Sequence, residues 1–311
     1  MGEGIVDPFI QMPLRDRAGN PVIGPDGKPV TGIVPNEEKR AVRDFTVITN
    51  PLTITLAAGS AAAPGAPEEV QFVIDTQGHF EWISFIGVST GNFLINFHDL
   101  SATQRKLQNK GIHSSNIMGI ARRPFRLPEP YLVNVRDGKR VITAILQDIS
   151  QSPNTVRLAL RGRRYYTRET VPNVAAYNDA KFKGLERTYS YFLMPTEFRV
   201  DGFNPDPIPG GGTALFTFRT DDDAETDIQK AMVVSTGPFE FTLREKSTNR
   251  TLSNGFVIDQ AGWGNAQFAF HFVDSYLLER TKDLVMEVTD LSGSDNTIYP
   301  CLCGRRLQYA K

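Results

Sequence analysis

The residues Gly87-Val88-Ser89-Thr90-Gly91 match the G-x-S-x-G pattern of a nucleophile elbow, in which a strained serine attacks an ester. That chemistry needs a strand, a sharp turn and then a helix. Here residues 92–97 follow, and their alternation of apolar and polar side chains predicts a strand. Residues 234–237 repeat Val-Ser-Thr-Gly, but Val233 stands where Gly87 would be. We therefore predict a structural turn, no catalytic residue and no enzymatic activity.

Other reactive side chains are also poorly arranged for chemistry. His79, His98, His113 and His271 are scattered without the spacing of metal ligands. The carboxylates of 221–227 (DDDAETD) suit calcium by type, but the loop lacks the glycine and terminal glutamate of a helical calcium site. A solvated turn is the favoured interpretation there, with a metal site as the alternative. We expect no metal and no cofactor.

Two further patterns are also poor candidates for a site. Cys301 and Cys303 are two apart in an expected strand, which suits neither a mutual disulfide nor a metal site. The glycines of 210–212 carry no following lysine, so they do not form a phosphate-binding loop.

An internal repeat organises the chain. Residues 148–164 (DISQSPNTVRLALRGRR) and 290–306 (DLSGSDNTIYPCLCGRR) are identical at nine of seventeen positions. Further matches upstream predict one β domain used twice, over residues 45–166 and 187–311, joined by a linker over 167–186 in which residues 171–186 are the best candidate for a short helix. Apolar residues at every second position, as at Phe93, Ile95 and Phe97, predict strands with one buried face. The short strands and frequent turns are typical of antiparallel sandwiches or jelly rolls.

Arginines gather on the last strand of the first copy. Strand alternation places Arg157, Arg161 and Arg163 on one face. A solvent-facing strand is the favoured interpretation, with a subunit interface or a contact with a phosphate backbone as alternatives. The second copy has Tyr299 and Cys303 at the positions of Arg157 and Arg161, so only Gly-Arg-Arg is common and we expect it to stabilise the fold.

Residues 1–44 belong to neither predicted copy. They are rich in Pro and Gly and include an expected hairpin turn at 25–28. Their apolar residues, among them Phe9, Ile10, Val22 and Ile23, favour an extended arm that orders against a neighbouring subunit over a disordered tail.

Composition narrows the class of protein. A net charge of −1 gives no global argument for nucleic acid or an anionic membrane. No secretory signal pattern or run of apolar residues long enough to span a membrane is present. Residues 45–168 carry 14 Lys and Arg against 8 Asp and Glu, a balance of +6, whereas 187–311 carry 12 against 17, a balance of −5. This asymmetry favours head-to-tail contacts between subunits, with drift after duplication as the alternative.

These features together resemble the virion structural proteins of tailed bacteriophages, of the cement, decoration or collar type. The resemblance is one of architecture: two tandem jelly-roll-like domains, a Pro/Gly-rich arm and no catalytic constellation. It implies non-covalent assembly with the major capsid or neck proteins of a phage particle, a homo-oligomer, and a location in the virion after assembly in the host cytoplasm. The alternative is a carbohydrate-binding module or adhesin, in which Tyr165, Tyr166, Trp263 and Tyr309 would stack on sugars.

Overall fold

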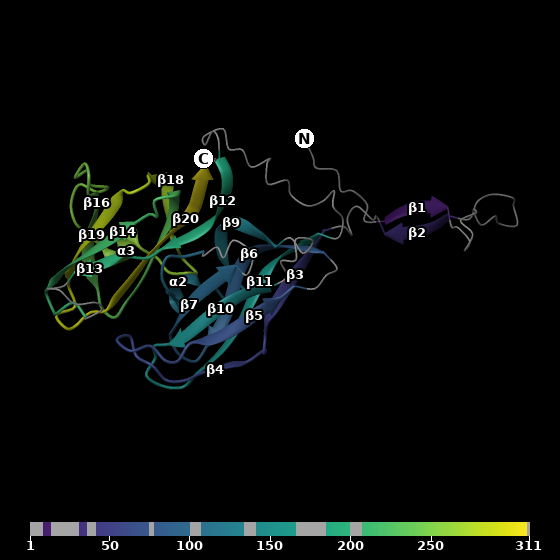
Figure 1. Ribbon diagram of the computed structural model, residues 1–311, viewed down its shortest axis with the longest axis horizontal. Helices are drawn as coiled ribbons and strands as arrows, with labels where there is room; N and C mark the ends of the chain where they lie inside the picture. Colours follow the sequence, from purple (N-terminus) through teal and green to yellow (C-terminus); the bar gives the residue numbers. More distant parts are fainter. Residues whose placement is uncertain are drawn as a thin grey trace, which may run out of the picture.

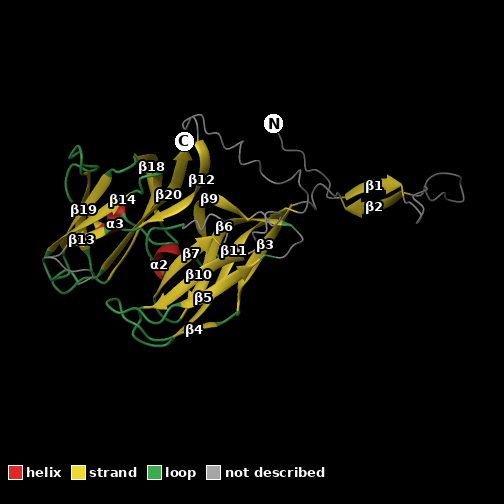
Figure 2. Ribbon diagram, viewed as in Figure 1, coloured by secondary structure: helices red, strands yellow, loops and turns green. Residues whose placement is uncertain are grey.

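The protein is described by a computed structural model, which covers residues 9–13, 31–35, 42–74, 78–99, 107–133, 141–165, 185–199 and 207–309. Almost every element is a strand, and every pairing between named strands is antiparallel (Figures 1 and 2). The prediction of an all-β antiparallel sandwich fold is confirmed. Several predicted features lie outside the described residues: Val22, Ile23, the turn at 25–28, Tyr166 and residues 171–184 of the expected helix.

The first sandwich is a nine-stranded sheet that curls over on itself. Its strand order is β8-β7-β10-β5-β3-β11-β6-β9, with β4 beside β11. The sheet continues from one layer to the other where Thr49 of β3 pairs with Phe72 of β5. The elements are β3 (Val42–Asn50), β4 (Ile54–Leu56), β5 (Glu68–Val73), β6 (His79–Ser89), β7 (Phe93–Asp99), β8 (Ile112–His113), α2 (Ser114–Ile117), β9 (Phe125–Val133), β10 (Val141–Asp148) and β11 (Asn154–Tyr165).

The second sandwich repeats this order of elements in two separate sheets. One sheet runs β12-β20-β15-β18 and the other β13-β14-β19-β16-β17. The elements are β12 (Leu185–Leu193), β13 (Glu197–Arg199), β14 (Thr213–Arg219), β15 (Glu225–Ser235), β16 (Phe239–Glu245), β17 (Val257–Ile258), α3 (Asp259–Gly262), β18 (Phe270–Leu278), β19 (Asp283–Asp290) and β20 (Ile298–Tyr309). Element by element, β3 corresponds to β12, β6 to β15, β9 to β18 and β11 to β20.

The alternating residues form the two cores. Phe93, Ile95 and Phe97 are fully buried, as are Phe239, Met286 and Val288 in the second sandwich. Phe268, Phe270 and Phe272 alternate in the same way in the sequence and predict a third buried face, but Phe268 and Phe270 keep 58% and 36% of their surface exposed. Phe268 precedes β18, and residues 272–275 form a long bulge opposite a single residue of β15, so the alternation does not reach the core.

The strands begin slightly earlier than the repeat indicates. β3 starts at Val42, which pairs with Tyr165 of β11, so part of the predicted arm is a strand. β12 starts at Leu185, inside the expected linker helix, and the end of that helix prediction is wrong. Nearer the N-terminus, β1 (Phe9–Pro13) and β2 (Thr31–Pro35) form a two-stranded sheet of their own. Phe9 and Ile10 lie in β1.

Candidate functional site at the junction of the two sandwiches

The serine pattern lies in a turn that is built twice. The Oδ1 atom of Asn154 accepts hydrogen bonds from the backbone N–H groups of Thr90 and Gly91 at 3.1 and 2.9 Å. Asn296 accepts in the same way from the Gly237 N–H at 2.9 Å. The next element after this turn is β7, a strand, so the helix that a nucleophile elbow requires is not there. The predicted structural turn is what the structure contains.

A buried aspartate supports each copy of this turn. Asp148 accepts from the Gly59 N–H and from the Ser150 hydroxyl, at 2.9 and 2.7 Å. Asp290 accepts from the Gly211 N–H and the Ser292 hydroxyl, at 2.9 and 2.8 Å. Burial alone would raise the pKa of Asp290, but the hydrogen bonds to its carboxylate outweigh burial and hold the pKa at about 2.

The Gly-Arg-Arg sequence that the two copies share lies at a β-bulge in each sandwich. A Cβ on Gly162 would lie 1.8 Å from the carbonyl oxygen of Glu81, and one on Gly304 would lie 2.1 Å from that of Asp227. Both glycines therefore allow neighbouring backbones to approach more closely than any side chain permits. The last arginine of each triplet is buried and lies over a ring of the adjacent strand, Arg164 over Phe45 and Arg306 over Tyr191.

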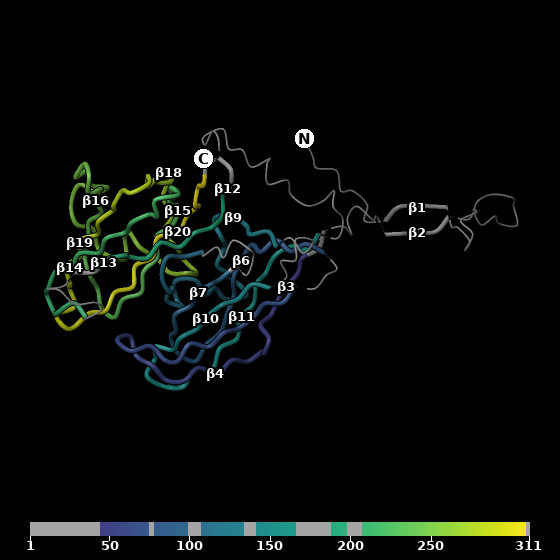
Figure 3. Tube along the Cα trace, viewed as in Figure 1, coloured from purple at the N-terminus to yellow at the C-terminus, as the bar shows by residue number. Residues whose placement is uncertain are grey.

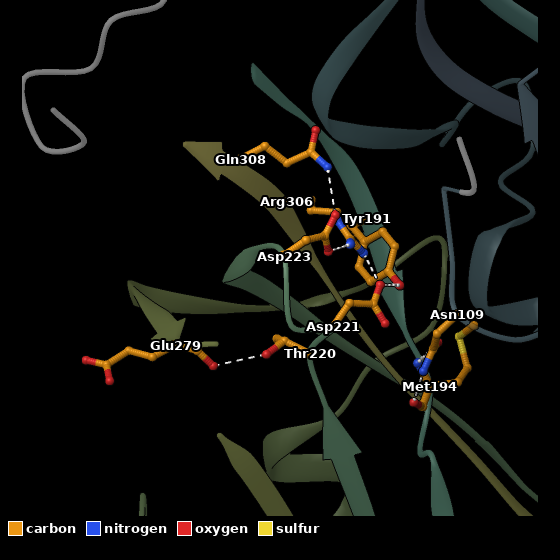
Figure 4. A network of polar contacts seen from close by, with 9 residues as sticks. All are labelled: Asn109, Tyr191, Met194, Thr220, Asp221, Asp223, Glu279, Arg306 and Gln308. Atoms are coloured by element: carbon orange, nitrogen blue, oxygen red, sulfur yellow. Dashed lines mark hydrogen bonds and ion pairs between the residues drawn. The ribbon is translucent and has the colours of Figure 1, made fainter. Parts of the chain in front are cut away.

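Arginine side chains form ion pairs with the aspartates of the acidic segment 221–227. Arg306 pairs with Asp221 and, at 2.6 Å, with Asp223 (Figure 4). The buried carboxylate of Asp227 accepts from Arg305 at 2.9 Å. Among the residues that the structure describes, no group of His, Cys, Asp or Glu is arranged to hold a metal ion. Asp221 and Asp223 lie in an exposed turn, as the solvated-turn interpretation predicts, whereas Asp227 is buried in β15.

The two sandwiches meet along a buried junction, where β9 lies against β12 (Figures 1 and 3). The Ser190 hydroxyl donates to the carbonyl of Glu129 at 2.7 Å and accepts from the N–H of the same residue at 2.8 Å. Phe125 of β9 contacts Phe192 of β12 with ring centroids 5.7 Å apart, and both rings are fully buried. The free edge of β9 is thus covered by the second sandwich.

A loop of the first sandwich extends this junction. The Asn109 side chain donates to the Met194 carbonyl at 2.7 Å and accepts from the Met194 N–H at 2.8 Å (Figure 4). The Phe192 N–H donates to the Leu107 carbonyl at 2.9 Å. The strand that opens the second sandwich is therefore held by both side-chain and backbone bonds.

The short helix α2 forms the third part of the junction. The Asn116 amide donates to the Tyr299 carbonyl at 2.8 Å, and the ring of His113 stacks on Tyr299 at 4.8 Å. Burial lowers the pKa of His113 to about 4, so it is neutral at pH 7. Cys301 and Cys303 are free thiols buried on the same face of β20 as Tyr299.

A cavity of about 360 Å³ opens beside this junction. Lys110, His113 and Asn116 contribute its polar wall, while Leu94, Met194 and Phe216 are among its apolar residues. The Lys110 ammonium donates to the Thr196 carbonyl at 3.0 Å, and burial lowers its pKa. The titratable side chains among the described residues that line the cavity are Lys110, His113 and Tyr299, and these residues include no carboxylate or thiol.

The predicted interface arginines lie on the outer face of the first sandwich. Arg157, Arg161 and Arg163 are exposed, while Val156, Leu158 and Leu160 are buried. Arg157 donates to the Thr53 hydroxyl at 3.1 Å. Of the aromatics considered for sugar stacking, Tyr165 and Trp263 are 4% and 6% exposed, so their rings are not available to a glycan.

Comparison with known proteins identifies no family. No family model and no curated protein matches the chain. Among solved structures, the chain is similar to N-glycanase F (PNGase F) at 8% identity and TM-score 0.35, covering 84% of this chain and 96% of that one. It is also similar to the PBSX exported protein XepA (10% identity, TM-score 0.23, 98% of this chain and 100% of that one). A third match is Sulfolobus Turreted Icosahedral Virus (10% identity, TM-score 0.23, 97% and 91%).

These matches are too distant to show an activity, since a shared fold class does not imply a shared function. None of the described helices has the length and apolar character needed to cross a bilayer.

Sequence reasoning missed the residues of the junction. Asn109, Phe125, Ser190 and Phe192 carry no signal for a contact when each is considered alone. A weak signal does exist at a spacing of 145, where Leu107 and Asn109 recur as Leu252 and Asn254. This repeat points to the junction only when the structure is known, because the loop with Leu107 is buried there and the matching loop with Leu252 is exposed.

Proposed function

We propose that this protein is a non-enzymatic structural component of a viral particle, which stabilises the particle through contacts between subunits. The finer assignment is a cement, decoration or collar protein of a tailed bacteriophage. Its partners would be major capsid or neck proteins and further copies of the chain. This role would be carried out by surfaces rather than by a reactive centre.

The observation that carries the proposal is an apolar outer face on the second sandwich. Ile258, Phe256 and Val273 lie on or beside β17 and β18 with 53%, 48% and 102% of their surface exposed. Exposed apolar residues gathered on one face of a protein mark an interaction site. The hydrogen bonds and buried rings at the junction support the same role, because they hold the two sandwiches together as one unit that can present two contact surfaces.

The predicted arm gives the proposal a second contact. We expect residues 1–40 to order against a neighbouring subunit, so that binding to a particle buries their apolar side chains. Deleting 1–40 leaves β3 complete from Val42 and should leave both sandwiches folded while weakening attachment. High salt should also weaken attachment, because exposed charge pairs are screened over about 10 Å at 0.1 M salt.

The test is to purify native particles from the source of the protein and to determine by mass spectrometry and cryo-electron microscopy whether the chain is present. A fixed copy number, with density that fits two sandwiches, is the expected result. If the chain is found free of any particle and a glycan array gives a specific hit, the carbohydrate-binding alternative replaces this proposal.

A further inference from the structure

We infer that the apolar outer face of the second sandwich is a docking surface for a second copy of this chain, which binds through the arginine-bearing face of its first sandwich. The inference deepens the proposed assembly role by naming the two surfaces. The β18 face consists of β17, α3, β18 and the loop 252–256. The β11 face consists of the outer sides of β3, β6 and β11.

The internal junction provides the pattern for this contact. There, the face of the first sandwich that corresponds to the β18 face is covered by the second sandwich. Strand register pairs Phe125 with Phe85 and Phe270 with Ala231, the equivalent of Phe85, so Phe125 and Phe270 occupy matching positions. Phe125 is 1% exposed, whereas Phe270 is 36% exposed.

Two other matched positions show the same difference. His113 is 3% exposed and its equivalent Ile258 is 53% exposed. Leu107 is 3% exposed and Leu252 is 39% exposed. The second sandwich therefore carries exposed apolar residues at three positions that the first sandwich buries. A cavity of about 440 Å³ opens here, lined in part by Phe241, Phe270 and Tyr276.

The β11 face is the equivalent of the surface that covers the first sandwich. In the second sandwich that surface contains Phe192, Cys303 and Lys230, all of them buried. The matched residues of the first sandwich are Thr46, Arg161 and Ser84, of which Thr46 and Arg161 are exposed and Ser84 is 4% exposed. Apolar residues remain exposed among the arginines, with Ile48 at 52% and Val88 at 69%.

A positive charge is retained at one matched pair of positions. At the internal junction the Lys230 ammonium lies 4.9 Å from the centre of the Phe125 ring. Lys230 pairs across strands with Cys303. In the first sandwich the same cross-strand pair is Ser84 and Arg161. The positive side chain is therefore on β11 in the first sandwich, whereas in the second it is on β15, the strand that corresponds to β6. Arg161 of a second copy is thus placed to lie over Phe270, as Lys230 lies over Phe125.

Charge also favours this pairing over contact between like surfaces. The first copy carries a balance of +6 over 45–168 and the second −5 over 187–311. Asp259 and Asp274 lie on the β18 face, where arginines of a second copy would meet them.

One contact is less favourable than at the internal junction. Asp44 replaces Ser190 and cannot donate to the backbone of β18, so the intermolecular contact should be the weaker and the more sensitive to salt.

Because the two surfaces differ, the contact is head-to-tail, and it extends into a chain or closes into a ring. Two blocked variants test this geometry. Ile258→Lys with Val273→Lys places positive charge on the β18 face, and Arg157→Ser with Arg161→Ser removes the charge of the β11 face without making it complementary to the lysines. All four residues are exposed, so both variants should fold as the wild type does. A matched control, Leu215→Lys with Leu291→Lys, changes exposed apolar residues outside both faces.

Sedimentation velocity across a concentration series gives the readout. The wild-type protein and the control should self-associate, and each blocked variant alone should associate at least about tenfold more weakly. Mixing the two blocked variants should give a one-to-one dimer, since each contributes one intact face. A mixture that stays monomeric while the wild type assembles, or blocked variants that assemble normally, would overturn the inference.

A wild-type chain that is monomeric in this assay would also overturn it. That result would leave the proposed function standing if the same chain is found on particles. Conversely, self-association with no particle would support the inference and remove the proposed function.

Discussion

Asn154 of the first sandwich and Asn296 of the second perform the same task 142 residues apart in the sequence. Each side chain is fully buried and accepts a hydrogen bond at 2.9 Å from the glycine N–H of a Val-Ser-Thr-Gly turn. Each is followed by a threonine whose N–H donates to the threonine hydroxyl of that turn at 2.9 Å. The identical pairs Asn154/Asn296 and Thr155/Thr297 therefore bond the start of one strand to the turn at the end of its neighbour.

Replacing either asparagine with alanine should destabilise its sandwich. Asn296→Ala removes the acceptor for the Gly237 N–H and the donor to the Gly237 carbonyl in a site that water does not reach. The free energy of unfolding should fall by about 2–4 kcal/mol, since each lost hydrogen bond contributes about 1 kcal/mol and unpaired buried groups cost more. Urea unfolding measures the change. Asp295→Ala, which lies next to it but is exposed, is the control and should be close to neutral.

The glycines of the two bulges should tolerate no side chain. Gly162→Ala and Gly304→Ala place a Cβ within 1.8 and 2.1 Å of a backbone carbonyl oxygen, so paired strands must separate. We expect a loss of at least about 2–3 kcal/mol or no soluble protein. Gly255→Ala is the control, because no atom lies within 4 Å of its added Cβ. Thermal unfolding of the three variants distinguishes a specific clash from a general effect of removing glycine.

Acid should weaken the second sandwich through Asp290. Its folded-state pKa of about 2 lies below the ordinary value near 3.9 for an aspartate. The unfolded chain therefore binds the proton first, and the stability that Asp290 contributes is present above about pH 4 and lost as the pH falls toward 2. Urea midpoints measured from pH 7 down to pH 3 should show a smaller decline in Asp290→Asn than in wild type. An equal decline in both would show that other groups carry the acid sensitivity.

The serine of the hydrolase-like pattern should be dispensable. Ser89→Ala should leave folding and assembly nearly unchanged, and a fluorophosphonate probe should not label the wild-type protein. The reason is structural, since Ser89 ends β6 and the following turn leads into another strand. Stoichiometric labelling at Ser89, detected by intact-mass spectrometry, would show an activated nucleophile and contradict the structural-turn interpretation.

The sequence predicts the β class and the duplicated core because both depend on local signals. Period-two alternation at Phe93, Ile95 and Phe97 reports a buried face directly, and shared residues such as Asn154 and Asn296 report a shared structure. The junction was not predictable in this way. Phe125 and Phe270 are the same residue type at matched positions, yet one is buried and the other exposed, because only the first has a neighbour. The pairing of Arg306 with Asp221 and Asp223 was missed because it joins residues more than eighty positions apart.

The two copies of one loop allow the internal junction to be tested with a matched pair of variants. Asn109 makes two hydrogen bonds to the backbone of Met194 across the junction, at 2.7 and 2.8 Å. Its counterpart Asn254 lies in the same loop of the second sandwich and is exposed. Asn109→Ala should therefore lower the free energy of unfolding by about 2–3 kcal/mol, because it leaves the backbone N–H and carbonyl of the buried residue Met194 without their partner.

Asn254→Ala should change the free energy of unfolding by less than about 0.5 kcal/mol in dilute protein, where the β18 face is free. Under conditions in which the chain self-associates, the same variant should weaken assembly, since Asn254 is placed to bond to a second copy as Asn109 bonds to Met194. Unfolding and sedimentation measured on both variants separate the two effects. Equal destabilisation of the monomer by the two substitutions would mean that the bonds of Asn109 to Met194 contribute nothing specific to the junction.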